Sequence, residues 1–305
     1  MVRVFGRHNY PELAASGAEL VRGDIRDPAA VSQAVLGCDA VIHTAAIAGI
    51  WGPRETYFDI NTRGTIHVLN ACRLHGIQKL VFTSSPSVTF DAHDQASIDE
   101  STPYPTRWLC SYPETKALAE QAVLAANGQN GLLTCALRPH LIWGPGDPHL
   151  VPRLLERARQ GKLRRVGDGT NLVDMIYVDN AADAHLQALD ALAPGAAVCG
   201  RAYYLSQGEP VNCWAWINEL LALDGQSPIK KSISRNAARR IGAILERVHT
   251  LFNLKSEPRM TRFLAAQLGD AHWYDIGAAR RDFGYAPRVS TVDGMRRLAE
   301  WLKIH

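Results

Sequence analysis

The chain has 305 residues, of which 47% are hydrophobic and 21% are charged, as in globular proteins with a large core. Its formal net charge of +3 is too small to indicate binding to nucleic acid or to an acidic membrane. It has no signal-peptide pattern, no apolar run of about 20 residues and no cysteines with metal-ligand spacing, so we expect a cytoplasmic protein with reduced thiols and no bound metal.

Short apolar runs alternate with amphipathic stretches of helix length through the first two-thirds of the chain. Strands that recur between helices indicate an α/β protein with a doubly wound parallel sheet, covered on both faces. The predicted strands cover residues 2–5, 19–21, 40–44, 79–84, 132–138, 174–178 and 202–205. The predicted helices cover residues 11–16, 28–36, 57–75, 113–127 and 181–192.

The alternation stops after residue 205, where helical patterns separated by turn residues continue to the end of the chain. A further segment without the alternation interrupts the sheet-forming part. This change predicts two domains. The larger, sheet-containing domain would consist of residues 1–145 and 172–205, and a smaller, mostly helical substrate domain would consist of residues 146–171 and 206–305.

Tyr112 and Lys116 form a Tyr-x-x-x-Lys pattern at the start of a predicted helix, where Pro113 suits the first helical position. Residues four apart share one face of a helix, so the Lys116 ammonium is expected near the Tyr112 phenol. A nearby cation lowers the pKa of a phenol from about 10 toward the range of an acid–base catalyst. The spacing also occurs by chance in many helices, where it means an exposed tyrosine and a solvated lysine.

The predicted strand at residues 79–84 leads into hydroxyl side chains, the last of which is Ser85. Ligands of open parallel sheets bind at the carboxyl ends of the strands, so the Ser85 hydroxyl is placed to bind a substrate oxygen while Tyr112 moves its proton. Ordinary turn chemistry explains these serines equally well on their own. Together, the strand end and the helix start favour a catalytic set of Ser85, Tyr112 and Lys116.

With further motifs along nearly the whole chain, this set resembles the extended short-chain dehydrogenase/reductases of the NAD-dependent epimerase/dehydratase superfamily. It is most similar to the branch of 3β-hydroxysteroid dehydrogenase/isomerase-like enzymes, which includes 2-alkyl-3-oxoalkanoate reductase-like enzymes. The order and separation of the motifs are more specific than any one of them. They are VRGDI at 21–25, HTAA at 43–46, NTRGT at 61–65, TSS at 83–85, YPETK at 112–116, LRP at 137–139, WGPGD at 143–147 and YVD at 177–179.

The resemblance implies a Rossmann-like sheet and named roles for several residues. Tyr112 would be the general acid and base, Lys116 would also bind the nicotinamide ribose, and Ser85 would orient the reacting carbonyl or hydroxyl. Asn61 would lie on a helix behind the site, with a surface amide as an equal alternative. The candidate dinucleotide-binding residues are Arg7, Asp24, Ile25, Thr44, Ala45, Ala46, Tyr112, Lys116, Pro139 and Leu141. The candidate substrate residues are Ser85, Pro86, His140, Trp143 and Asn171.

The chain departs from the family at its start, because it contains no glycine-rich turn of the kind that binds the pyrophosphate. Residues 2–7 instead resemble the family's second strand. We therefore expect about 25–35 residues, comprising the first strand, the glycine loop and a helix, to be missing. Met1 would then be a misassigned start or the result of truncation, and the printed chain would bind its cofactor poorly.

Arg7 lies just after the first predicted strand, at the position where the resemblance implies selection between the two nicotinamide cofactors. An acidic residue there favours NAD through the ribose hydroxyls, whereas an arginine accommodates the 2′-phosphate of NADP. With His8 beside it, Arg7 favours NADP(H) over NAD(H). A solvated surface arginine is the alternative.

Apolar side chains recur at helical spacing between residues 241 and 252. A domain core is the preferred interpretation, ahead of a lid over a hydrophobic substrate and of a helix that contacts a membrane surface. The bulky tryptophans of this half of the chain add apolar surface. The predicted reaction is hydride transfer between NAD(P)(H) and a secondary alcohol or ketone, on a sterol-like 3β-hydroxyl or a long-chain 3-oxo/3-hydroxy acid.

Two other functions stay open. A nucleotide-sugar epimerase uses the same serine, tyrosine and lysine, and would need cationic and amide groups for the nucleotide. The candidates for these groups are Arg153, Arg164, Arg165 and Asn171. A non-catalytic binding protein on a degenerate Rossmann scaffold would explain the missing glycine loop. Sugar dehydration is disfavoured, because no acidic residue follows Thr83 directly.

The expected partners are a small hydrophobic substrate and a second copy of the chain, with no nucleic acid and no membrane span. The homodimer is expected by analogy of fold, through the predicted helices at 57–75 and 113–127.

Overall fold

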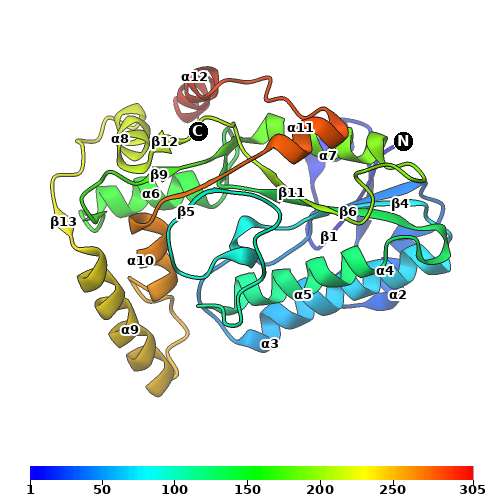
Figure 1. Cartoon of the computed structure of the whole chain (residues 1–305), viewed down its shortest axis with the longest axis horizontal. Helices are drawn as coiled ribbons and strands as arrows, with labels where there is room; N and C mark the ends of the chain where they lie inside the picture. The colour runs from blue at the N-terminus through cyan, green and yellow to red at the C-terminus, as the bar shows by residue number, and fades with distance from the viewer. Residues whose placement is uncertain (305) are drawn as a thin grey trace.

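Four parallel strands form the central sheet, in the order β11-β6-β4-β3 (Figure 1). In the computed structural model, which describes residues 1–304, they are β3 (Ala40–His43), β4 (Lys79–Thr83), β6 (Leu133–Pro139) and β11 (Ala202–Leu205). Leu80, Val81 and Phe82 of β4 are fully buried, as expected of an apolar strand that is covered on both faces. The predicted α/β fold class is confirmed.

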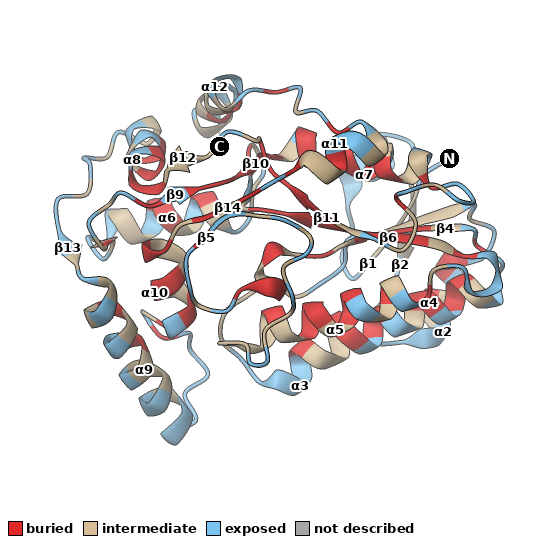
Figure 2. Ribbon diagram, viewed as in Figure 1, coloured by how far each residue is buried: buried red, intermediate tan, exposed pale blue. Residues whose placement is uncertain are grey.

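Helices cover both faces of this sheet, and the strand residues facing them are buried (Figure 2). Leu80 and Phe82 pack into one hydrophobic core, whereas Val81, which points the other way, packs into another. The helices of the first core are α2 (Pro28–Val35), α4 (Gly64–Leu74) and α5 (Ser111–Ala125), and those of the second are α7 (Val178–Ala191) and α11 (Gly277–Phe283).

A second parallel pair of strands lies beside the central sheet but is not hydrogen-bonded to it. The pair and its connecting helix are β1 (Arg3–Gly6), α1 (Pro11–Ala15) and β2 (Glu19–Arg22). The Arg3 guanidinium donates to the carbonyl oxygens of Ala34 and Leu36 at 3.0 and 2.7 Å, which ties β1 to the end of α2. Among residues 1–304, β1 and β3 each have a strand partner on one edge only. A missing central strand would leave these two edges open, but its absence stays a prediction.

A further core lies at the other end of the molecule, around Trp143, Trp214 and Trp216, which are at most 5% exposed. The helices around it are α6 (Leu150–Arg159), α8 (Cys213–Leu223) and α12 (Thr291–Leu302). The packing of α6 on α8 brings the segment 146–171 against the C-terminal part of the chain. In contrast, α11 packs on α7 and the central sheet, so the segment 206–305 contributes to both ends of the molecule.

Short strands connect the two ends. One sheet has the order β12-β9-β14-β5 and consists of β5 (Gln95–Ile98), β9 (Leu172–Val173), β12 (Val211–Asn212) and β14 (His272–Tyr274). Two pairs accompany it, β7 (Ile142–Trp143) with β10 (Ile176–Tyr177) and β8 (Arg165–Val166) with β13 (Ser232–Ile233). Of these short strands, the sequence indicated only the one that contains β10, because the others have no apolar run that alternates regularly with helices.

The predicted helix at residues 57–75 is present but not uniform. It begins with α3 (Arg54–Tyr57), continues through a π-helical segment, η1 (Phe58–Arg63), and ends with α4. The segment bears the buried side chains of Asn61 and Thr62. Two 3₁₀ turns complete the chain, η2 (Pro86–Thr89) and η3 (Gln129–Gly131).

Helix α9 (Arg235–Leu251) extends along the edge of the molecule, with α10 (Arg262–Gly269) beside it (Figure 1). Ile244, Leu251 and Phe252 are 59, 79 and 67% exposed, so the preferred interpretation of this stretch as domain core is wrong. Helical spacing identifies an apolar face, but it does not show whether another element covers that face. Among residues 1–304, no helix combines the length and the apolar character needed to cross a membrane.

Candidate active site

The start of α5 meets the end of β4 and brings Ser85, Tyr112 and Lys116 together. Tyr112 lies in the first turn of α5. Ser85 directly precedes η2, and its hydroxyl is close enough to hydrogen-bond the Tyr112 phenol. The Lys116 ammonium, one turn further along α5, donates to the Thr83 carbonyl oxygen at 2.6 Å. The structure thus places the predicted catalytic set around the carboxyl end of β4.

Burial and Ser85 are the main influences on the Tyr112 phenol. Burial raises the pKa of Tyr112 above its ordinary value of 10.0, and the hydrogen bond with Ser85 acts in the opposite direction. The expected lowering of this pKa by Lys116 is not a leading effect here. The ammonium is held by the Thr83 carbonyl and lies 4.0 Å from the centre of the Phe82 ring.

Lys116 is 2% exposed, and burial lowers the pKa of its amine to about 7. The Glu120 charge acts in the opposite direction, but Arg138 already binds that carboxylate at 2.6 and 3.0 Å. Burial, together with the Lys116 charge, also lowers the pKa of His43 to about 3. His43 is therefore neutral, and its Nε2 hydrogen-bonds the Thr65 hydroxyl at 2.9 Å. The buried amine is thus held by neutral groups, the Thr83 carbonyl and the Phe82 ring. Because these contacts replace only part of the lost solvent, a hydrogen bond from the amine to a ligand hydroxyl would stabilise it further.

Asn61 joins the loop after β3 to the catalytic helix. It is 1% exposed, so the alternative of a surface amide is wrong. Its side-chain oxygen accepts from the Ile47 N–H at 2.8 Å, and its amide nitrogen donates to the Ile47 carbonyl at 3.2 Å and to the Thr115 hydroxyl at 3.1 Å. Asn61 is therefore a positioning residue that acts through Ile47 and Thr115.

Charged side chains gather at the carboxyl ends of β1 and β2. The Asp24 carboxylate accepts from the Arg26 guanidinium at 2.7 and 3.0 Å, and these hydrogen bonds lower the pKa of Asp24 to about 2. Arg7 contributes to this lowering through its charge, so its guanidinium lies near the carboxylate. The Arg7 side chain is exposed and has no ion-pair partner among residues 1–304. The exposed Arg7 guanidinium beside Asp24 therefore remains accessible to a ligand at this end of the site.

The predicted dinucleotide residues fit the two ends of such a cofactor but not its middle. Thr44, Ala45 and Ala46 form an exposed stretch after β3, as expected of a surface that a ligand covers. Ile25 is buried against Gly64 at the start of α4, where a Cβ atom would approach its side chain to within 2.9 Å. Among residues 1–304, no glycine-rich turn supplies the N–H donors that a pyrophosphate requires.

The end of β6 is strained where the resemblance places the nicotinamide. The chain leaves Pro139 through His140, whose ring lies 4.8 Å from that of His272 and 5.0 Å from that of Tyr274. Burial holds the pKa of His140 well below its ordinary value of 6.5, so the ring is neutral. Leu141 has a φ of +44°, in a region that is unfavourable for its branched side chain. Strained backbone of this kind occurs preferentially at functional sites.

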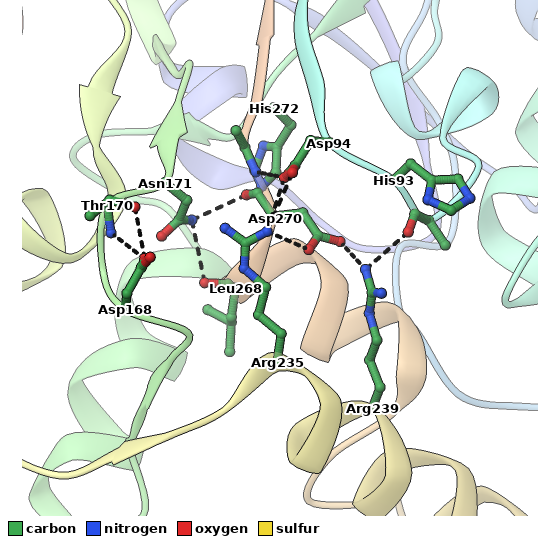
Figure 3. A network of polar contacts seen from close by, with 12 residues as sticks. His93, Asp94, Asp168, Thr170, Asn171, Arg235, Arg239, Leu268, Asp270 and His272 are labelled. Atoms are coloured by element: carbon green, nitrogen blue, oxygen red, sulfur yellow. Dashed lines mark hydrogen bonds and ion pairs between the residues drawn. The ribbon is translucent and has the colours of Figure 1, made fainter.

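The remaining predicted substrate residues are buried in packed surroundings. Pro86 is buried in η2, and Trp143 packs against Trp216 with ring centres 5.5 Å apart. Asn171 lies within a polar network between β9, α9 and α10, where its amide donates to the Leu268 and Asp270 carbonyl oxygens at 3.4 and 3.1 Å (Figure 3). The contacts of Trp143 and Asn171 are thus with Trp216 and with backbone carbonyls before β14, and their role in substrate binding stays a prediction.

A pocket of about 790 Å³ lies beside the start of α5. Cys110 and Ser111 line it and directly precede Tyr112, so the pocket reaches the catalytic helix. Its other lining residues are Ile50, Trp51, Gly52, Tyr57, Leu109, Ala243, Glu246, Arg247, Thr250, Leu251 and Arg262. Sequence reasoning missed this set, because α9 is far from the catalytic motif along the chain. The amphipathic pattern at residues 241–252 was the one signal for its involvement.

Two proteins of known name are similar to this chain over nearly its full length. The 2-alkyl-3-oxoalkanoate reductase of Stenotrophomonas maltophilia (strain K279a) is 54% identical over 299 residues, which cover 97% of this chain and 90% of the relative. A protein of the same name from Shewanella oneidensis (strain MR-1) is 48% identical over 301 residues, which cover 96% of this chain and 78% of the relative.

Among solved structures, the fold is similar to that of dTDP-glucose 4,6-dehydratase from Streptomyces venezuelae, crystallised with NAD and TYD. The TM-score is 0.76 at 22% identity, with 100% of this chain and 88% of that chain covered. The similarity to the two reductases, on this shared fold, defines the class of protein as an NAD(P)-dependent oxidoreductase of the extended short-chain dehydrogenase/reductase type.

The model of the 3-beta hydroxysteroid dehydrogenase/isomerase family matches residues 2–234. The chain belongs to this family. The resemblance deduced from the sequence motifs, and with it the expected enzyme class, is confirmed.

Proposed function

We propose that the protein interconverts a secondary alcohol and a ketone on a hydrophobic substrate, with NADP(H) as cofactor. The meeting of Ser85, Tyr112 and Lys116 beside the pocket is the observation that carries this proposal. When bound, the nicotinamide ring supplies a hydride to the carbonyl carbon or takes one from the alcohol carbon. The names of the two similar reductases support the same reaction type.

The chain's own residues move the proton and hold the reacting oxygen. The Ser85 hydroxyl, oriented by the Ser87 hydroxyl at 2.8 Å, hydrogen-bonds the substrate oxygen. Tyr112 donates its phenolic proton to that oxygen in reduction and takes it back in oxidation. Because burial raises the pKa of Tyr112, the phenolate left after reduction needs the positive charge of Lys116 nearby.

Replacing Tyr112 with Phe tests this assignment, because the change removes the transferable proton and little else. We expect turnover of hydrophobic ketones to fall by about 100- to 10,000-fold, measured by the absorbance of NADPH, with NADPH binding nearly unchanged. Tyr203→Phe is a matched control, since it removes a buried hydroxyl that hydrogen-bonds Asp282 at 2.7 Å outside the site. Substantial activity in Tyr112→Phe would refute the role of Tyr112.

The preference for NADP(H) rests on Arg7, whose unpaired guanidinium lies beside Asp24 at the end proposed for the adenosine ribose. We expect Arg7→Gln to weaken NADPH binding by about tenfold and to leave NADH binding unchanged, measured by fluorescence titration. Arg22→Gln, on the neighbouring strand, is the comparison variant. Equal weakening of both cofactors by Arg7→Gln would contradict the preference.

A nucleotide-sugar epimerase would use the same catalytic set, but two of the four groups expected for a nucleotide, Arg153 and Asn171, are engaged elsewhere. Arg153 forms an ion pair with Glu257. The Asn171 amide binds backbone carbonyls in the network of Figure 3. These contacts support the reductase over the epimerase. Tight binding of a uridine diphosphate sugar by the protein would instead favour the epimerase over the reductase.

A further inference from the structure

The pocket beside Tyr112 combines apolar side chains with one charged wall. Ile50, Trp51 and Leu109 contribute apolar surface, and a single face of α9 contributes the charged wall. The residues of that face recur at intervals of three and four and are Ala243, Glu246, Arg247, Thr250 and Leu251. A ligand that fills the pocket therefore contacts ionic as well as apolar groups.

The charges on this wall do not cancel. The Glu246 carboxylate accepts from the Arg262 guanidinium at 2.6 Å and from the Arg262 backbone N–H at 2.6 Å, which makes these two residues a neutral pair. Arg247 forms no hydrogen bond or ion pair with any residue in 1–304. The wall therefore presents one cation that no carboxylate of the described chain neutralises.

The charged wall is close to the catalytic tyrosine. Burial raises the pKa of the Cys110 thiol to about 12, and the Glu246 carboxylate lies near enough to contribute to this rise. Cys110 is two residues before Tyr112. Tyr57, which also lines the pocket, is buried, which raises the pKa of its phenol, and the Tyr112 phenol is near enough to add to that effect. Cys110 and Ser111, the two residues before Tyr112, line the pocket together with the face of α9 that bears Arg247.

The position of α9 is fixed by ion pairs along its first half (Figure 3). Arg235 pairs with Asp94 at 3.3 Å, and Arg239 pairs with Asp270 at 2.6 Å. Asp270 is 2% exposed, so these contacts hold the helix to the body of the protein. Arg247 therefore extends from a helix with a defined orientation.

We propose that Arg247 binds the carboxylate of an acid substrate in this pocket, while the apolar residues take its hydrocarbon chain. The inference rests on the proposed function and deepens it, because it selects a long-chain 3-oxo or 3-hydroxy acid over a sterol-like alcohol. A guanidinium matches a carboxylate with two parallel hydrogen bonds. Arg247 is exposed, and a neutral sterol carries no carboxylate for its charge, so Arg247 favours the acid over the sterol.

Oxidation of 3-hydroxydecanoic acid and of its methyl ester tests the proposal, because the two compounds differ in charge but share the reacting hydroxyl. We expect Arg247→Gln to raise the KM for the acid by about tenfold, with kcat and the KM for the ester unchanged. Arg247→Lys should restore part of the loss, since it keeps the charge but not the two parallel hydrogen bonds. Added salt should raise the KM of the wild type for the acid alone.

Arg240→Gln is the matched control, because Arg240 is an exposed arginine of the same helix outside the pocket. It should leave the kinetics of both compounds unchanged. An equal change for acid and ester in Arg247→Gln, or no change for either, would overturn the proposal while leaving the proposed reaction intact.

Failure of the wild type to oxidise either compound would instead count against the proposed function. Calorimetric titration with decanoate and decanol, neither of which carries the reacting hydroxyl, then decides on Arg247 separately. Tighter binding of decanoate than of decanol in the wild type, lost in Arg247→Gln, would support the carboxylate site. Equal binding of the two compounds would overturn it.

Discussion

The amine of Lys116 shows how burial tunes a single side chain. The amine is almost fully buried, contacts a carbonyl oxygen and an aromatic face, and has its pKa lowered to about 7 by loss of solvent. The sequence predicted Lys116 as a partner of Tyr112 through helix spacing. It could not predict that Lys116 would point toward the end of β4, because that direction depends on how α5 packs on the sheet.

The depressed pKa of Lys116 has a consequence for stability. Its ordinary pKa is 10.5, so between pH 7 and 10.5 the unfolded chain binds a proton that the folded protein lacks. The contribution of Lys116 to stability therefore rises with pH across this window. Lys116→Met should be more stable than the wild type by about 2–4 kcal/mol near pH 6, and this difference should shrink as pH approaches 10.

Urea unfolding at several pH values measures the difference. Lys230→Met, at an exposed lysine, is the control and should show no difference that varies with pH. A constant difference between wild type and Lys116→Met across the range would contradict the lowered pKa.

Among the elements, the strands that alternate with helices could be predicted, whereas most of the strands in the smaller sheet and in the β7–β10 and β8–β13 pairs could not. Strand β4, for example, has the apolar centre Leu80-Val81-Phe82, which makes it recognisable in the sequence. In contrast, β5 and β14 pair although they are far apart in the chain, and neither has a recognisable pattern. For the same reason the catalytic set was accessible from the motifs, but the wall of the pocket formed by α9 was not.

At the level of helix packing, Gly242 sets how closely α9 approaches the segment before α10. A Cβ atom at this position would lie 2.6 Å from the Thr261 carbonyl carbon and 2.7 Å from the Arg262 nitrogen. Backbone atoms cannot move aside easily, so Gly242→Ala should lower the free energy of unfolding by about 1–3 kcal/mol. Helix propensity alone would favour the alanine by about 1 kcal/mol.

Thermal unfolding of Gly242→Ala measures the sum of the steric overlap and the gain in helix propensity. Arg240→Ala, at an exposed position of the same helix, shows the effect of an alanine substitution without the overlap. Because α9 also carries Arg247, the displaced helix should weaken the discrimination between acid and ester. Stabilisation by Gly242→Ala would show that the two segments are not in close contact.

At the scale of the whole molecule, the sheet is divided into β2-β1 and β3-β4-β6-β11. Doubly wound dinucleotide-binding sheets are continuous through their first strand, which lies between the two groups observed here. The missing glycine motif predicts that this strand is absent here, and its absence stays a prediction. The structure shows how β1 and β2 are nevertheless held, by Arg3 and by the packing of Phe5 beside the core that contains α2.

A two-stranded unit with few buried residues should open more readily than the central sheet. We expect the backbone amides of β1 and β2 to exchange with deuterium at least tenfold faster than those of β4 and β6, measured by mass spectrometry. NADPH should slow exchange in β1 and β2 if Arg7 binds it, whereas the central strands serve as the internal control. Equal protection of both groups would show that the sheet unfolds as one unit.

The π-helical turn that carries Asn61 has a consequence for how this site can change over evolutionary time. A π turn contains one residue more than the α-helical turn it replaces, so it corresponds to a one-residue insertion in the helix. Deleting one residue between Phe58 and Arg63 would restore a regular helix and rotate the preceding residues by about 100° relative to α4. This single deletion would move Asn61 out of position for its hydrogen bonds with Ile47 and Thr115. The contact between the loop after β3 and α5 therefore depends on the number of residues in this helix as well as on their types.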